Sequence, residues 1–160
     1  MEIIKALKEF PLLSQLDDNE LTALSNLLIK EEFEKGMNII TENDIDKEMY
    51  LLISGTVDVI KTTIYGDKFV CATLDDKMHC VFGEMALIDN DKRSATVLAK
   101  TNCMTLKMDS DAFNLYCTNY PKAGISLLKL MNINLIRNLR AENENLRLVY
   151  QALIEEIESN

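Results

Sequence analysis

The stretch FGEMALIDNDKRSATV, residues 82–97, places a Gly-Glu pair before a short apolar segment and one arginine before a β-prone run. Gly83 lets the backbone come close to a ligand, and residues 85–87 are good helix formers for about one turn. The N-terminus of such a turn presents free N–H groups and favours negative charge. Arg93 adds a planar donor fork that suits phosphate. The stretch therefore predicts a site for a small anion.

Glu84 narrows the choice of anion, because a carboxylate beside a phosphate repels it unless the ligand also donates a hydrogen bond. A ribose hydroxyl is such a donor, so we expect a sugar with a phosphodiester, with Glu84 on the hydroxyl and Arg93 on the phosphate. One arginine with backbone amides suits a singly charged phosphodiester. A nucleoside triphosphate would need a P-loop or a magnesium site, and the sequence has no GxxxxGK[ST].

These residues resemble the phosphate-binding cassette of the cyclic-nucleotide-binding domain family, which includes the catabolite activator protein, regulatory subunits of cyclic-AMP-dependent kinases and cyclic-nucleotide-gated channels. The cassette has the form F-G-E-[LM]-A-L, a short variable tip and R-[SAT]-A-[TW]-V, and residues 82–97 fit it throughout. The resemblance extends to PLLSQLDDNELTAL, to KGMNIITENDIDKEMYLLISGTVDVI, to AKTNC and to the closing helix. It therefore covers nearly the whole chain.

The resemblance implies a role for individual residues. Glu84 and the Gly83 amide would bind the ribose 2′-hydroxyl, whereas Arg93 and the amides of Ala86 and Ser94 would bind the cyclic phosphate. An ungapped count from Arg93 brings Asn138 to the place in the closing helix that reads the base. The expected ligand-binding residues are Phe82, Gly83, Glu84, Met85, Ala86, Arg93, Ser94, Ala95 and Asn138.

The ligand implied is cyclic AMP or cyclic GMP, and no cofactor or metal is expected. A hydroxyl at position 94 is compatible with either base, and we favour cyclic AMP. Two positions depart from the family pattern: His79 and Cys80 occupy a loop where G-D-x is usual, and Asn43 replaces a glycine. Asn43 is a mild change, because asparagine tolerates left-handed backbone geometry.

Composition limits the class of protein. The 160 residues are 48% hydrophobic, which is enough for one domain with a real core. The net charge of −9 argues against nucleic acid or a membrane surface as partner, since both need clustered positive charge. The sequence shows no signal peptide and no membrane-spanning run, so we expect a cytoplasmic protein. Its four separated cysteines suit reduced thiols.

The order of elements predicts an α+β, mainly β fold. Helices are expected at Glu2–Phe10 and from about Asp17, where Asp17 and Glu20 form a capping-box pattern. From about Lys30 to Met108 the sequence consists of short β-prone runs broken by turns, typical of a sandwich or barrel. The family resemblance specifies an antiparallel β-roll, a jelly-roll-like double-stranded β-helix, with N-terminal helices and a long C-terminal helix.

The closing segment from Pro121 to Glu158 is expected to be one helix of about 37 residues, or roughly 55 Å. We place the β-roll with its N-terminal helices at residues 1–120 and the C-terminal lid and dimerisation helix, in the same domain, at 121–160. The first half of the helix has a broad apolar side that suits packing on the β-body: Leu127, Leu128, Leu130, Met131, Leu135, Ile136 and Leu139. Heptad-spaced leucines continue beyond this first half. This favours a homodimer through the helix, and the alternative is a helix that bends near Glu142 and folds back.

The sequence thus predicts a stand-alone sensor that binds a cyclic nucleotide, moves its C-terminal helix and signals to an unknown downstream protein. The alternative is a structural or protein-interaction module that retains the fold without responding to nucleotide. No residue pattern supports catalysis, so we do not expect an enzyme.

Overall fold

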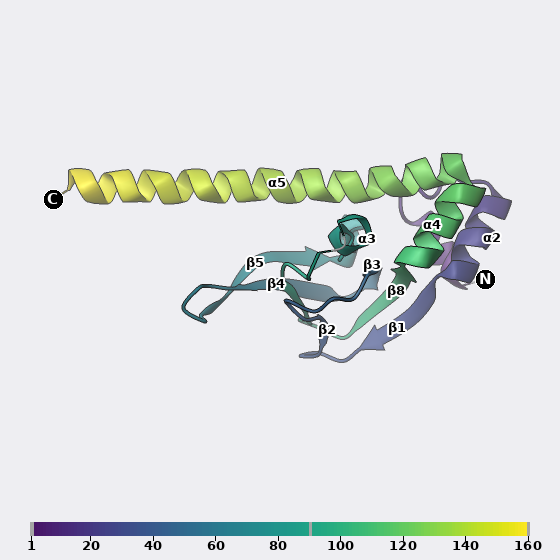
Figure 1. The fold of residues 1–160 in the computed structure, drawn as a ribbon, viewed down its shortest axis with the longest axis horizontal. Helices are drawn as coiled ribbons and strands as arrows, with labels where there is room; N and C mark the ends of the chain where they lie inside the picture. The colour runs from purple at the N-terminus through teal and green to yellow at the C-terminus, as the bar shows by residue number, and fades with distance from the viewer. Residues whose placement is uncertain (1, 90, 160) are drawn as a thin grey trace.

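The computed structural model describes residues 2–89 and 91–159, in which two antiparallel sheets form a roll flanked by helices (Figure 1). One sheet has the strand order β1-β8-β3-β6 and the other the order β2-β7-β4-β5. This arrangement confirms the expected β-roll. The strands are β1 (Ile29–Phe33), β2 (Asn38–Ile40), β3 (Glu48–Ser54), β4 (Thr56–Thr62), β5 (Lys68–Asp75), β6 (Val81–Phe82), β7 (Thr96–Ala99) and β8 (Cys103–Asp109).

The N-terminal helices are α1 (Glu2–Lys8) and α2 (Asp18–Leu27). The predicted capping box begins α2: the Asp17 carboxylate accepts from the Glu20 amide at 2.8 Å, and Glu20 accepts from the Asp17 amide at 3.0 Å. Each bond satisfies an amide that has no partner within the helix. The first helix ends two residues earlier than expected, at Lys8 rather than Phe10.

Strand β3 shows how the core is divided. Met49 and Leu51 point to a cluster that they form with the helices, whereas Tyr50 and Leu52 point to a second cluster inside the roll. This follows from the two-residue period of a strand, which sends alternate side chains to opposite faces. The β-roll is therefore held to the helices by one face of the first sheet and keeps the other face for its interior.

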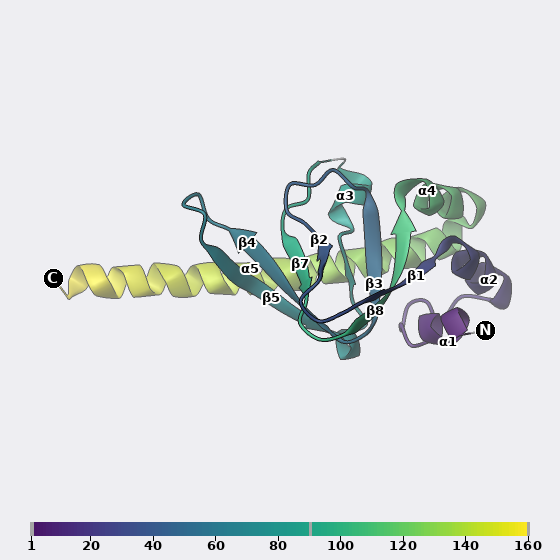
Figure 2. The same cartoon turned by 90° about the horizontal axis from the view of Figure 1, so that it is seen from below.

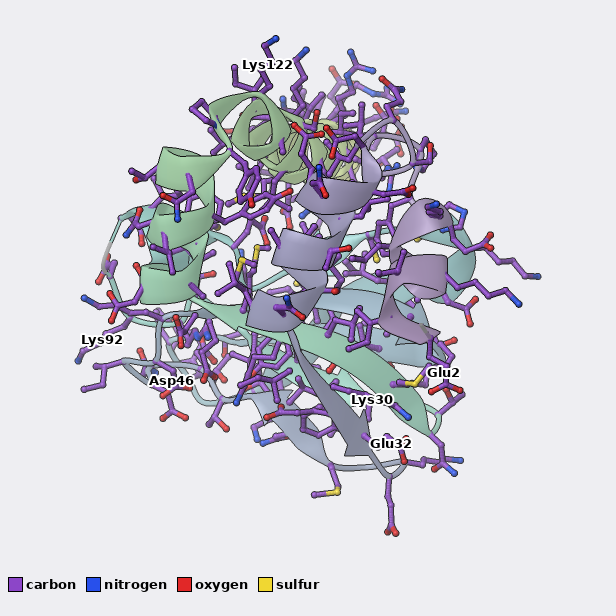
Figure 3. The ribbon with its side chains drawn as sticks, turned by 90° about the vertical axis from the view of Figure 1, so that its right-hand side faces the viewer. Glu2, Lys30, Glu32, Asp46, Lys92 and Lys122 are labelled. Atoms are coloured by element: carbon purple, nitrogen blue, oxygen red, sulfur yellow. The ribbon has the colours of Figure 1, made fainter. Side chains whose placement is uncertain are left out.

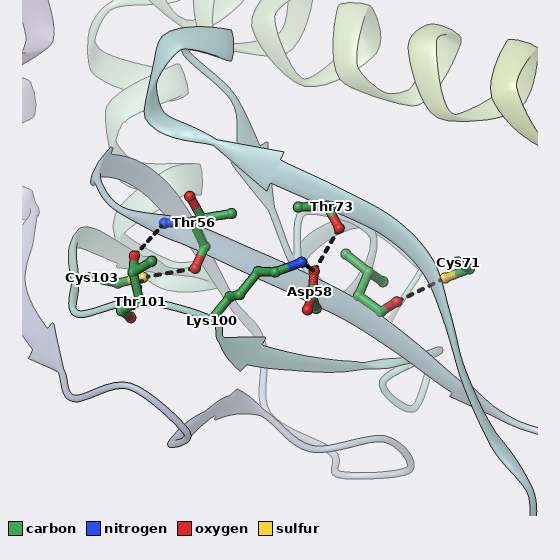
Figure 4. Close-up of polar contacts among 8 residues, drawn as sticks. Thr56, Asp58, Cys71, Thr73, Lys100, Thr101 and Cys103 are labelled. Carbon is green, nitrogen blue, oxygen red and sulfur yellow. Dashed lines mark hydrogen bonds and ion pairs between the residues drawn. The ribbon is translucent and has the colours of Figure 1, made fainter.

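The second sheet is joined by polar contacts as well as by its strand pairing. Asp58 of β4 accepts hydrogen bonds from the hydroxyl of Thr73 at 2.6 Å and from the Lys100 ammonium at 3.1 Å (Figure 4).

All four cysteines are free thiols, and Cys80 and Cys103 are buried while Cys71 and Cys117 are half-buried.

The chain closes with α4 (Ser110–Asn119) and α5 (Pro121–Glu158). Helix α5 has 38 residues and runs without a bend past the end of the β-roll (Figures 1 and 2). The alternative of a bend near Glu142 is therefore not what the structure adopts. Among residues 2–89 and 91–159, no helix is both long and apolar enough to span a bilayer.

The part of α5 that packs on the domain is shorter than the sequence suggested. Leu127, Leu130 and Met131 are buried, but Leu135 and every described residue after it are exposed. Leu128 was expected on the β-body as well, and it is also exposed. The reason is geometric: the β-roll touches only one side of the helix and ends before the helix does.

Candidate functional site

A cavity of about 190 Å³ lies between the cassette, the interior of the roll and α5. The structure brings together in its wall all nine residues expected from the sequence: Phe82, Gly83, Glu84, Met85, Ala86, Arg93, Ser94, Ala95 and Asn138. The rest of the wall was not predicted from the sequence. Its apolar strand residues have the same pattern whether they fill a core or line a pocket, and its charged residues lie in the variable tip of the cassette. These further residues are Ile40, Val59, Leu74, Val81, Asp89, Asp91, Lys92 and Val97.

Gly83 is closely surrounded by its neighbours. Its φ is +74°, in the left-handed region that favours glycine. A Cβ here would lie 2.7 Å from Cδ1 of Ile40 and 3.0 Å from both Nη1 of Arg93 and the main-chain oxygen of Glu48. The close approach of three groups therefore requires glycine for a second reason besides backbone conformation.

The residues after Gly83 form the short helix α3 (Met85–Ile88). Ala86 and Leu87 are buried, and Ala86 lines the cavity. The first amides of a helix have no intrahelical acceptor, so a single turn is enough to present N–H groups. The predicted one-turn helix is thus present at the position where the sequence placed it.

Two main-chain hydrogen bonds hold Arg93 in place. Its amide donates to the oxygen of Asp44 at 2.8 Å, and its own oxygen accepts from the amide of Asn43 at 2.9 Å. Asn43 has a φ of +71°, the left-handed geometry expected from its place in the family pattern. The loop between β2 and β3 therefore fixes the backbone that presents the arginine.

The guanidinium of Arg93 is buried, with only 4% of the residue exposed. Its Nη1 donates to the main-chain oxygen of Gly83 at 2.8 Å. Its Nε and Nη2 are also buried and have no hydrogen-bond partner among the residues that the structure describes. A guanidinium stays charged in proteins, and buried donors without acceptors are costly. The two nitrogens are therefore suited to an anion in the cavity.

Glu84 is the second buried charged side chain of the cavity wall, also 4% exposed. Burial raises the pKa of its carboxyl group, while a hydrogen bond from its own backbone and the charge of Arg93 act in the opposite direction. The cavity thus combines a buried cation and a buried carboxylate. A ligand that is anionic at one point and donates a hydroxyl at another matches both groups.

Helix α5 reaches the site at two residues one turn apart. Asn138 is exposed and lines the cavity. Asn134 is buried, does not line the cavity, and donates a hydrogen bond from Nδ2 to the main-chain oxygen of Val81 in β6. Asn134 was not predicted from the sequence, and its spacing of four residues from Asn138 is the signal that could have identified it.

Aromatic contacts support the cassette from the interior and from the outside. The rings of Phe82 and Tyr50 stack with centroids 5.3 Å apart and planes 11° from parallel. His79 has a φ of +44°, and its ring packs edge-on against Phe10 with centroids 5.6 Å apart. The loop that departs from the family pattern is therefore anchored to the N-terminal segment.

Comparison with known proteins gives the same family throughout. The family model described as "Cyclic nucleotide-binding domain" matches residues 30–120. The cAMP-dependent protein kinase regulatory subunit of Yarrowia lipolytica is 38% identical over 107 residues, which are 67% of this chain and 27% of that protein. The chain spans about a quarter of the length of the curated kinase subunits that it matches.

Solved structures agree in fold. The regulatory subunit of a cAMP-independent protein kinase A from Trypanosoma brucei has a TM-score of 0.71 and 26% identity, over 89% of this chain and 50% of that one. The catabolite activator protein of Thermus thermophilus has a TM-score of 0.70 and 27% identity, over 88% of this chain and 63% of that one. The resemblance first noted at residues 82–97 is confirmed, and the chain belongs to the cyclic nucleotide-binding domain family.

Proposed function

We propose that the chain is a regulatory module without catalytic activity, which binds a cyclic mononucleotide in the cavity beside Arg93, with cyclic AMP preferred to cyclic GMP. The observation on which this depends is the pair of buried nitrogens, Nε and Nη2 of Arg93, that have no acceptor among the described residues. A cyclic phosphate would accept from both at once, as a planar guanidinium favours.

The other contacts follow from the residues around Arg93. The amides of Ala86 and Ser94 would donate to the same phosphate, and Glu84 with the Gly83 amide would bind the ribose 2′-hydroxyl. Phe82, Met85 and Ala95 would complete the wall around the sugar. Only a ligand with both a phosphate and a hydroxyl satisfies the buried cation and the buried carboxylate together.

The preference for adenine is supported by Asn138, since an amide can pair with the N6 donor and the N7 acceptor of adenine. The names of the relatives do not decide this point: the Yarrowia lipolytica protein is named cAMP-dependent, whereas the Trypanosoma brucei protein is described as cAMP-independent. The base preference therefore depends on the cavity itself.

The signal would pass through α5, because this helix lines the cavity at Asn138 and contacts strand β6 at Asn134. A ligand shifts α5 only if it binds one helix position more tightly than another. Beyond the β-roll, the exposed leucines of α5 would form a homodimer, and residues 121–160 would act as lid and dimerisation helix for the module of residues 1–120. The downstream protein would read the position of α5.

A second candidate function is a structural or protein-interaction module whose fold no longer responds to nucleotide. It is favoured by the apolar residues that α5 exposes beyond the roll, among them Leu146 and Leu153. This candidate predicts self-association that is indifferent to nucleotide, so light scattering with and without cyclic AMP separates the two.

Isothermal titration calorimetry with cyclic AMP, cyclic GMP and adenosine tests the proposal. We expect cyclic AMP to bind most tightly and adenosine, which lacks phosphate, most weakly. Arg93→Ala should weaken cyclic AMP binding by about 2 kcal/mol or more. Lys68→Ala is the matched control, because Lys68 is an exposed cation outside the cavity wall and its loss should change little. Absence of heat with either cyclic nucleotide at millimolar concentration would contradict the proposal.

A further inference from the structure

Charge is segregated along α5. Residues 121–141 contain four basic residues, Lys122, Lys129, Arg137 and Arg140, and no acidic residue. Residues 142–158 contain five glutamates and one arginine. The two parts of the helix therefore carry net charges of +4 and −4 in a chain whose net charge is −9. Lys122, at the start of the basic part, projects away from the sheets (Figure 3).

A stripe of exposed leucines runs through both parts. It lies on a different side of α5 from the residues that pack on the domain: at about 100° per residue, Leu128 is turned by about a quarter of the circumference from the buried Leu127. A second helix could therefore pack on the stripe without displacing α5 from the cavity. The leucines follow heptad spacing: Leu128, Leu135, Leu139, Leu146 and Leu153.

We infer that this stripe pairs with the same stripe of a second copy of the chain, and that the two helices run antiparallel. This rests on the self-association proposed above and adds its direction. In an antiparallel pair the basic part of each helix lies along the acidic part of the other. In a parallel pair in register, the half of each helix with net charge +4 lies along the like half of the other, and so do the two halves with net charge −4, which is unfavourable.

The residues of the stripe give the same answer independently of net charge. In a parallel pair in register, Glu142 would face Glu142 of the second copy within the seam, and two carboxylates at that place repel each other. An antiparallel pair centred between residues 140 and 141 avoids this contact. Leu128 then faces Leu153 of the second copy, Leu135 faces Leu146, and Glu142 faces Leu139 beside the cationic Arg140.

The antiparallel arrangement also fits the shape of the subunit. The distal part of α5, which its own β-roll does not cover, would lie along the proximal part of the second copy (Figure 1). The two β-rolls would then sit at opposite ends of the helix pair. Asn138 lies close to the centre, so a shift of α5 at one cavity would act directly on the contact between the two helices.

Cysteine crosslinking tests the direction. Leu128→Cys and Leu153→Cys chains are prepared separately, mixed, and treated with a short thiol-specific crosslinker, and the bridged peptides are mapped by mass spectrometry. We expect bridges between positions 128 and 153 in the mixture and none between identical positions when either variant is treated alone. The unmodified chain defines the background from its four native cysteines. Bridging of Leu153→Cys to itself would show a parallel pair and overturn the inference.

Ionic strength provides a second measurement on the unmodified chain. From about 0.1 M to about 1 M salt the Debye length falls from about 10 Å to about 3 Å. An antiparallel pair should dissociate more readily at high salt, with the dissociation constant raised about fivefold or more, whereas a parallel pair should tighten.

The outcomes distinguish this inference from the proposed nucleotide binding. A monomeric mass in sedimentation equilibrium would overturn the pairing, as would a dimer without any bridge between positions 128 and 153. Calorimetry with cyclic AMP on the same sample reports separately whether the cavity binds nucleotide, and failure of either property leaves the other measurable.

Discussion

Asn134 in α5 donates a hydrogen bond to the main-chain oxygen of Val81, the residue directly before Phe82 and Gly83 of the cassette. Both groups are shielded from water, since Asn134 and Val81 are buried. The bond therefore ties the position of the helix to the strand that leads into the cavity, across 53 residues of sequence. A displacement of α5 must break or re-form it.

Asn134→Ala should lower the free energy of unfolding by about 1 to 3 kcal/mol, because the oxygen of Val81 is then left buried without its donor. Asn132→Ala is the matched control: Asn132 lies two residues away and also donates its amide to a main-chain oxygen, but it is exposed. Urea unfolding of both variants measures the difference. Equal costs would show that the bond to Val81 contributes nothing.

The nucleotide affinity of Asn134→Ala tests whether Asn134 positions the cassette, because a loss of packing alone would not change this affinity. Asn134 does not line the cavity, so a direct ligand contact is not lost in Asn134→Ala. We expect this variant to bind cyclic AMP more weakly in calorimetry at a temperature where it remains folded. Asn132→Ala should bind as the unmodified chain does, and a similar loss in both variants would contradict a positioning role.

The contrast between Asn138 and Asn134 shows what could be predicted from sequence. Local sequence patterns were sufficient to predict the cassette, the cap formed by Asp17 and Glu20, and the left-handed turn at Asn43. Each of these features depends on residues close together in the chain. The position of Asn138 followed from an ungapped count. An asparagine within a helix is usually expected to be exposed to solvent. Neither a local pattern nor a residue count therefore predicts the buried contact of Asn134.

The exposure of α5 was predicted only in part for a related reason. Hydrophobic spacing shows that a helix has an apolar side, but not how far the surface that covers it extends. Leu128 and Leu135 were expected to pack on the β-body and are exposed, whereas Leu127 and Leu130 are buried. Residues such as Ile40 and Val59 likewise line the cavity although their strands show ordinary core patterns.

Gly83→Ala should destabilise the protein and reduce cyclic AMP binding together. The new Cβ would meet Ile40, Arg93 and the oxygen of Glu48, and it would add backbone strain at a φ of +74°. We expect a loss of about 2 to 4 kcal/mol in unfolding free energy, from roughly 1 to 2 kcal/mol of left-handed strain plus crowding.

Gly66→Ala separates the two effects of the Gly83 substitution. Gly66 has a φ of +91°, but nothing lies within 4 Å of the place where its Cβ would be. This variant should therefore lose only the roughly 1 to 2 kcal/mol of backbone strain and should keep its affinity for nucleotide. Thermal unfolding and calorimetry of the pair measure the crowding at the cassette, and equal losses would show that crowding is absent.

Glu84→Gln should stabilise the protein at neutral pH while weakening nucleotide binding. The folded-state pKa of Glu84 is raised by burial, so folding is favoured by its protonated form. Its contribution to stability is complete below the ordinary glutamate pKa and is lost as the pH rises through the folded value. Glutamine removes this dependence on pH. It would also remove the proposed charge-assisted bond to the ribose hydroxyl, worth about 1.5 to 3 kcal/mol of affinity.

Stability curves for both proteins from pH 4 to pH 8, with calorimetry at neutral pH, check this prediction. The free energy of unfolding of Glu84→Gln relative to the unmodified chain should grow as pH rises. A difference that is constant with pH would show that Glu84 does not titrate abnormally. Unchanged cyclic AMP affinity would remove the carboxylate from the ribose contact.

If the proposed homodimer forms through α5, Leu146→Glu should dissociate it without abolishing nucleotide binding, because Leu146 lies in the exposed stripe of α5 and does not line the cavity. Two leucines are lost per dimer, and each contributes about 1.5 kcal/mol or more on burial, so the dissociation constant should rise about 100-fold or more. Leu148→Glu is the control, since Leu148 is similarly exposed but on another side of the helix.

Light scattering with and without cyclic AMP measures the self-association of both variants. A sensor requires the association of the unmodified chain to change with nucleotide, and association that stays the same while cyclic AMP binds would favour the structural module instead.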